Sequence, residues 1–348
     1  MSCSKIFSGD LPELIYEIIK NFQNEYSTLH SCVLVNRLWC RLAIPLLWEN
    51  PFSITTGNYN FIEVYLYNLN DYLKTKINNY QIINNLLPSN TLFNYPSFIK
   101  YLNMCNITLS IERWLEANNK TSNSAVSEFK RLINMSLVKL FIENEVNLHT
   151  FKIEINNIHY YDTIYDILEI ILQNFNFIHN IRNLNLSIVN NHCKSMLIKN
   201  RISQIINLHQ NLKRILFGYC QNELILRNLG LILPSKLEYL SLALRMINTN
   251  DFEVFLKDSQ DTFFKKLLIN NLIGGYSDDI DILPYIKEYI MKKKRVQYLA
   301  IKNTLYNRVD VDLSNFKDEV NEFKLHNIKV LKYDNLSTDI YRFVNEID

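Results

Sequence analysis

A repeated apolar pattern constrains the fold of this 348-residue chain more than any other feature. Triplets spaced as apolar-x-x-apolar-x-apolar recur, with central residues separated by 25 positions (Ile215 to Leu240) up to 33 (Phe151 to Leu184). Such a triplet predicts a buried strand, and a recurrence of this size is typical of stacked repeats. The units are Leu148/Phe151/Ile153, Ile181/Leu184/Leu186, Leu212/Ile215/Phe217, Leu237/Leu240/Leu242, Phe264/Leu267/Ile269, Val296/Leu299/Ile301 and Ile328/Leu331/Tyr333, after a weaker Ile99/Leu102/Met104.

Helical periodicity occupies the segments between these predicted strands. Ile164, Ile167, Leu168 and Ile171, for example, share one face of a helix. Because parallel strands need a crossover connection, this alternation predicts an α/β fold with a parallel sheet. Stacking would bury the apolar face that each unit leaves uncovered, so residues 98–348 are expected to form a solenoid. The drifting period leaves open an irregular α/β domain with a parallel sheet and no true solenoid.

A second apolar pattern, of purely helical spacing, covers residues 11–48. Pro12 suits the first turn of a helix, and Ser27 or Thr28 can cap a second one. Three helices this short cannot bury all their apolar surface among themselves. Trp39 and Trp48 therefore suggest a patch left for another chain, unless the segment is a helical cap with both tryptophans facing inward.

The motifs in this segment resemble an F-box, and residues 8–52 are interpreted as one. The motifs are the opening Leu11-Pro12-Glu13-Leu14, the central Val35-Asn36-Arg37-Leu38-Trp39 and the closing Leu46-Leu47-Trp48. Residues 53–97 are expected to form a helical linker. Residues 98–348 are similar to degenerate leucine-rich repeats, whose usual asparagine or cysteine after the strand occurs in only two units, as Asn156 and Cys220.

The resemblance implies a substrate-recognition subunit of a Skp-cullin-F-box ubiquitin ligase, which itself catalyses nothing. The F-box would bind a Skp-family adaptor, and through it a cullin, while the repeats hold a protein substrate. The alternative is an F-box scaffold that does not assemble a ligase. The residues expected to contact the adaptor, some of which must also hold the helices together, are Leu11, Pro12, Ile15, Ile18, Leu29, Val33, Val35, Trp39, Leu46 and Trp48.

The strand register also predicts a substrate-binding face. Side chains between the buried residues of each strand point to the opposite face of the sheet, and basic residues outnumber acidic ones among them. Two tyrosines lie between these charges, so an acidic or phosphorylated peptide would suit this face. The predicted substrate residues are Lys152, Arg214, Tyr239, Lys266, Leu268, Tyr298 and Lys302.

The composition of the chain limits the partners, the compartment and the kinds of site that can be expected. A net charge of +2 gives no reason to expect nucleic acid or membrane partners, and no apolar run of about 18 residues could span a bilayer. Scattered cysteines indicate reduced thiols in the cytoplasm or nucleus, and they fit no zinc spacing. Only six glycines are present, which argues against glycine-rich phosphate loops and dinucleotide-binding motifs. No Gly-x-Ser-x-Gly motif indicates a catalytic serine, so no catalytic, metal or cofactor site is expected. The run Lys292-Lys293-Lys294-Arg295 is interpreted as a helix end rather than an import or nucleic-acid patch.

Overall fold

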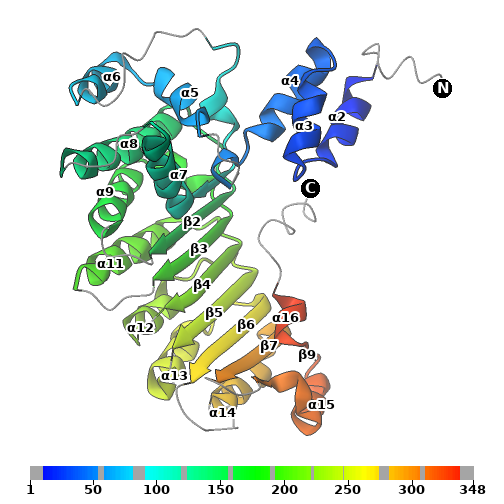
Figure 1. Cartoon of the computed structure of the whole chain (residues 1–348). Helices are drawn as coiled ribbons and strands as arrows, with labels where there is room; N and C mark the ends of the chain where they lie inside the picture. The colour runs from blue at the N-terminus through cyan, green and yellow to red at the C-terminus, as the bar shows by residue number, and fades with distance from the viewer. Residues whose placement is uncertain are drawn as a thin grey trace. The chain divides into compact units, whose positions relative to one another are not determined.

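In the computed structural model the chain divides into two compact units, Met1–His149 and Thr150–Asp348 (Figure 1). The structure describes residues 11–53, 59–80, 91–118, 124–155, 160–188, 193–220, 223–245, 247–273, 282–305 and 310–337. Asn156 lies outside these ranges, and so do residues 8–10 of the expected F-box. Cys220 ends a strand, but its side chain is not described.

The first unit begins with three helices, here called the three-helix segment: α2 (Pro12–Lys20), α3 (Tyr26–Val33) and α4 (Arg37–Leu47). Pro12 occupies the first turn of α2, where its missing N–H leaves no hydrogen bond unmade. Asn36 caps α4 by accepting a hydrogen bond from the Trp39 N–H. The core of the segment consists of Ile15, Ile19, Leu29, Cys32, Trp39, Ala43 and Leu46.

Where the structure describes it, the rest of the first unit is helical, with one short strand. Its elements are η1 (Pro51–Ser53), α5 (Phe61–Tyr67), α6 (Asp71–Asn78), η2 (Tyr95–Phe98), β1 (Tyr101–Asn103), α7 (Met104–Ala117) and α8 (Ser124–Glu143). Phe52, Tyr65 and Phe141 form an aromatic cluster with ring centroids 5.4 to 6.3 Å apart. The described part of the expected linker is therefore packed, through Tyr65 of α5, into a core that includes α8.

The compact units divide after His149, whereas the repeat domain was expected to begin at residue 98. Helices α7 and α8 contact each other and also α5, so residues 98–149 belong to the first unit. The weak triplet Ile99/Leu102/Met104 is buried here around β1. A triplet cannot reveal this division, because the same apolar pattern suits a strand in either unit.

The second unit alternates strands and helices. Its elements are β2 (Thr150–Ile155), α9 (Tyr161–Leu172), α10 (Phe175–His179), β3 (Asn183–Ile188), α11 (Cys193–Leu208), β4 (Arg214–Cys220), α12 (Glu223–Ile232), β5 (Tyr239–Arg245), α13 (Thr249–Asp258), β6 (Phe264–Ile273), α14 (Leu283–Ile286), the π-helical turn η4 (Lys287–Met291), β7 (Val296–Leu305), β8 (Val311–Asp312), η5 (Leu313–Asn315), α15 (Lys317–Leu325), β9 (Lys329–Val330) and α16 (Tyr333–Leu336). Strands β2 to β7 pair in parallel in chain order, confirming an α/β fold with a parallel sheet.

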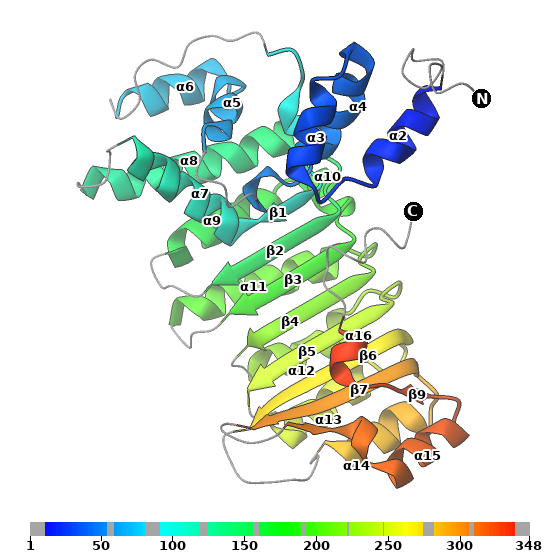
Figure 2. The ribbon, with the colours of Figure 1, turned by 45° about the vertical axis from the view of Figure 1, so that its right-hand side comes forward.

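The central triplet residues lie side by side across this sheet. Leu184, Ile215, Leu240, Leu267 and Leu299 are register partners on successive strands, and all are buried. Helices α9, α11, α12 and α13 cover that face of the sheet (Figures 1 and 2). The opposite face, here called the open face, carries the alternate side chains of each strand.

The last expected unit departs from the pattern. Only Lys329 and Val330 pair with β7, while β8 pairs with it antiparallel. Tyr333 begins α16, which lies on the open face, opposite α11, α12 and α13 (Figures 1 and 2). The triplet Ile328/Leu331/Tyr333 therefore supplies a two-residue strand and the entry to a helix rather than another full strand.

Candidate protein-docking surfaces

The three-helix segment exposes large apolar side chains around the turn between α3 and α4. Leu34 is 74% exposed and Val35 is 49% exposed, and Leu14 on α2 is 43% exposed. Leu34 directly follows α3 as its C-cap and Val35 precedes the cap residue Asn36, so both lie outside the helical faces that form the core. Exposed apolar side chains of this size are candidates for contact with another protein.

The residues predicted to contact an adaptor divide into two groups. Ile15, Leu29, Trp39 and Leu46 belong to the core of the segment, with at most 9% of any of them exposed. They hold the helices together, so a partner could not reach them without opening the segment. Leu11, Pro12, Ile18, Val33 and Trp48 are partly buried, and only Val35 is exposed.

Leu14 and Leu34 are accessible residues that sequence reasoning missed. Leu34 directly precedes the pair Val35-Asn36, and an asparagine at a helix start indicates a turn before it. That cap signal could have placed Leu34 in a turn. Leu14 and Ile18 are one helical turn apart on α2, so the helical period could have paired them.

The end of α4 is fastened to the remainder of the first unit. The Trp48 ring lies 5.4 Å from that of Tyr65 and 4.3 Å from that of Tyr95. The buried Glu49 carboxylate accepts a hydrogen bond from Gln23 and forms an ion pair with Lys100, both at 2.5 Å. Burial raises the pKa of Glu49, and the Lys100 charge only partly offsets this shift.

The open face brings together most of the predicted substrate residues. Arg214, Tyr239, Lys266 and Tyr298 are register partners on β4, β5, β6 and β7. In the adjacent row, Lys152 lies at the β2 end and Leu268 lies on β6, while Lys302 is further along β7. The strand alternation therefore placed these side chains on one face of the sheet correctly.

The charges on this face differ from the prediction of a free basic surface. Lys152 pairs with Glu154 at 2.9 Å. Lys302 pairs with Asp310 at 2.6 Å and with Asp334 at 3.6 Å, and the Asp310 hydrogen bond raises the pKa of Lys302. Arg214 is buried. Acidic residues of the same chain thus already pair with some of the basic side chains that an acidic ligand would need.

An apolar group on the open face is covered by the C-terminal segment. Tyr239, Leu268 and Ala300, here called the anchor patch, are buried together with Leu336 of α16. Burial raises the pKa of Tyr239 well above its usual range, with the nearby Tyr333 as a smaller cause. Leu268 and Tyr239 were predicted to be available to a substrate, and here they are inside a small core. The sequence contains no signal that the last triplet would turn onto this face.

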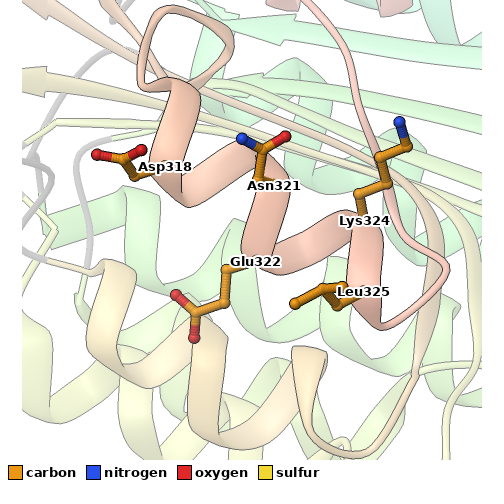
Figure 3. Close-up of a pocket in the computed structure, with 5 residues that line it drawn as sticks. All are labelled: Asp318, Asn321, Glu322, Lys324 and Leu325. Atoms are coloured by element: carbon orange, nitrogen blue, oxygen red, sulfur yellow. The ribbon is translucent and has the colours of Figure 1, made fainter.

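A shallow hollow on α15 is lined by Asp318, Asn321, Glu322, Lys324 and Leu325 (Figure 3). All five residues come from one helix, and their polar groups do not converge on a common point (Figure 3). Lys287 pairs with Glu319 and Glu322 beside it. The hollow offers no enclosed volume for a small molecule.

The basic run Lys292–Arg295 follows the end of a helix, as predicted. Arg295 is buried and donates hydrogen bonds to the carbonyl oxygens of Thr262 (3.2 Å) and Leu256 (3.0 Å). Burial lowers its pKa to about 10. Lys292 pairs with Glu288 one turn earlier in the chain. Arg295 therefore links β7 to the end of α13 and is not part of an exposed basic patch.

No family model matches this chain, and neither a curated protein nor a solved structure matches it. Within the described ranges, no group of three or more His, Cys, Asp or Glu side chains could hold a metal ion. The described helices include none that is long and apolar enough to cross a membrane.

Proposed function

We propose that this protein is a substrate-recognition adaptor of a cullin-RING ubiquitin ligase of the Skp-cullin-F-box type. In this proposal the three-helix segment is an F-box that binds a Skp-family adaptor, and the second unit is a leucine-rich-repeat-like domain that binds the target protein. The observation that carries the proposal is the exposure of Leu34 and Val35 beside a closed core. The protein would act in the cytoplasm or nucleus, with its cysteines reduced.

The energetic argument rests on what these side chains gain in a complex. Fully burying a leucine or valine side chain is worth about 1.5–3 kcal/mol. Leu34 gains little of this within the chain and Val35 gains only part of it, because the core of the segment closes without them. A partner that covers them would recover it, and a few such residues typically supply most of the energy of an interface.

The junction after α4 supports a positioning role. Trp48 packs on Tyr65 and Tyr95, and Glu49 is buried against Lys100. A docked adaptor would thus be held in a fixed orientation to the rest of the first unit. Receptors of this type contribute effective concentration and orientation, while other subunits perform the chemistry.

The test is a binding titration of the full chain against a purified Skp-family adaptor. Leu34→Glu places a charge where the adaptor would exclude water, so binding should weaken at least tenfold. Leu231→Glu is the matched control, since Leu231 on α12 is 70% exposed in the other unit and should bind like the wild type. Absence of binding by the wild-type chain would overturn the proposal.

The alternative of a scaffold that does not assemble a ligase predicts a different second result. Under the proposal, a cullin added to the complex of chain and adaptor should co-purify with both. If the adaptor binds and the cullin does not, the scaffold alternative would replace the ligase assignment.

A further inference from the structure

We infer that the anchor patch on the open face is a docking site for a peptide segment with a leucine two residues after an acidic residue, and that α16 occupies it in cis. The inference deepens the proposed function and rests on it, because the displacing segment would belong to the captured target. Leu336 and Asp334 of α16 show which chemistry the site accepts. Leu336 packs against Leu268, Ala300 and Tyr239, while Asp334 lies 3.6 Å from Lys302.

The patch differs from the rest of the open face. In the register row that runs from β2 to β7, the first residues are Lys152 and Asn185, which are partly exposed and polar. Leu268 and Ala300 at the other end of the same row are completely buried. A site that accepts an apolar side chain therefore continues into a stretch of polar side chains, where a longer ligand could make hydrogen bonds.

The contacts that hold α16 are local and involve few residues. This helix has four residues, and helices shorter than about 12 residues are not stable by themselves in water. Its buried side chain is Leu336, while Asp334 and Asn335 are exposed. The Tyr333 N–H donates a hydrogen bond to Asp312 Oδ2 at 2.9 Å. Asp334 is exposed, and Lys302 is half-buried and pairs more closely with Asp310 at 2.6 Å, so the 3.6 Å pair with Asp334 contributes little. A competing segment would have to displace Leu336 and the partly buried Tyr333 ring, which packs against the same cluster.

The tether explains why α16 would compete well despite these few contacts. Val330 pairs with Leu299 of β7, and the Leu331 N–H donates to the Leu299 carbonyl oxygen at 2.9 Å. These bonds keep α16 beside the patch even when Leu336 is out of it. The segment then has a high effective concentration, and a target must exceed it in affinity or in the number of its contacts.

The experiment measures binding of a fluorescent peptide with the sequence of residues 328–337 to the full-length protein. Wild-type protein should bind it weakly, because α16 already fills the patch. Leu336→Ala should bind it at least tenfold more tightly. Asp334→Lys, which replaces attraction to Lys302 with repulsion, should also bind it more tightly than wild type. Asp334→Lys keeps the protein folded if Leu336→Ala does not, because it changes only an exposed side chain. Asn335→Lys is the control, since it adds charge to the exposed part of the same turn and should bind like wild type.

Two outcomes would overturn the inference: equal peptide affinity for wild type and both variants, or no binding to folded Asp334→Lys protein. Either would make α16 a permanent structural cap. Adaptor binding by the three-helix segment, measured on the same preparations, keeps the two proposals separate. Adaptor binding without peptide binding would remove this inference alone, whereas peptide binding without adaptor binding would remove the proposed function and leave the docking site.

Discussion

The three-helix segment and the open face of the sheet differ in the solvent exposure of their leucines. Leu34 lies in solvent beside a core that is complete without it. Leu268 lies on a sheet face but is completely buried, because Leu336 of the same chain covers it. The first surface can receive a partner as it stands, whereas the second must first lose its own segment. An apolar residue on a helix or sheet surface thus indicates a docking site only when it is known whether another segment of the chain packs over it.

The largest effect that would test this contrast is expected from Trp39→Ala. Trp39 is in the core of the three-helix segment, so truncation should cost about 3–5 kcal/mol of unfolding free energy. Hydrogen exchange should accelerate throughout α2, α3 and α4 and stay unchanged in β3 to β6. Loss of adaptor binding in this variant would report unfolding rather than a lost contact. A folded segment with slow exchange would show that Trp39 is not a core residue.

The second unit should lose stability in mild acid because of His209. This side chain is completely buried, its Nδ1 accepts a hydrogen bond from the Asn211 N–H, and burial lowers its pKa to about 4. The unfolded chain takes up the proton near pH 6.5, so stability should fall by roughly 3 kcal/mol between pH 6.5 and 4. Urea unfolding at several pH values measures this.

His209→Gln supplies the comparison for that pH series. The glutamine does not titrate, so the fall in stability across the same pH range should be clearly smaller than in wild type. His179→Gln, at the exposed neighbour whose ring centroid lies 6.3 Å from that of His209, should keep most of the wild-type fall in stability, because burial is the larger cause of the lowered pKa of His209 and the His179 charge is a lesser one. Identical pH profiles for wild type and His209→Gln would contradict the assignment.

The first unit should respond to acid in the opposite direction through Glu49. Because burial raises its pKa, the folded state favours the protonated carboxyl, and this contribution to stability grows as pH falls through the raised value toward the unfolded one. Glu49→Gln should therefore be neutral or stabilising at pH 7, by about 1 kcal/mol or less. Denaturant unfolding of this variant and of the exposed control Glu17→Gln measures the difference. A large loss specific to Glu49→Gln would mean that the ion pair with Lys100 outweighs burial.

The smallest effect on stability is expected from Leu34→Ser. Leu34 packs on little, so the unfolding free energy should change by less than about 0.5 kcal/mol. The mutation tests the contrast directly, because Leu336→Ser on the other surface should destabilise its segment measurably. If Leu34→Ser unfolded the three helices, the turn between α3 and α4 would be structural rather than a free docking surface.

Short-range periodicity predicted the elements and much of the sheet. The triplets placed Leu184, Ile215, Leu240, Leu267 and Leu299 on the buried face of adjacent strands, and the structure confirms that register. This works because a strand alternates its side chains strictly, so one apolar face fixes the other. The same rule placed Arg214, Tyr239, Lys266 and Tyr298 together on the open face.

Longer-range packing could not be predicted in the same way. Residues 98–149 were expected to belong to the repeat domain from the weak triplet Ile99/Leu102/Met104, yet α7 and α8 pack with α5 in the first unit. In the three-helix segment, Trp39 and Val35 are both motif residues, but only Val35 is exposed. A sequence motif shows which residue types occur at a given spacing, but it does not show which of them are buried in the core.

The sequence by itself determined strands β2 to β7, their register and the two faces of the sheet, because backbone geometry ties each of these to local side-chain spacing. Only the tertiary structure decided which apolar residues remain accessible, since that depends on segments far apart in the chain. Leu268 and Leu336, for example, meet because the chain turns at β9 and places α16 on the open face. Whether a residue is buried depends also on the segment that packs over it, and no local sequence pattern specifies that segment.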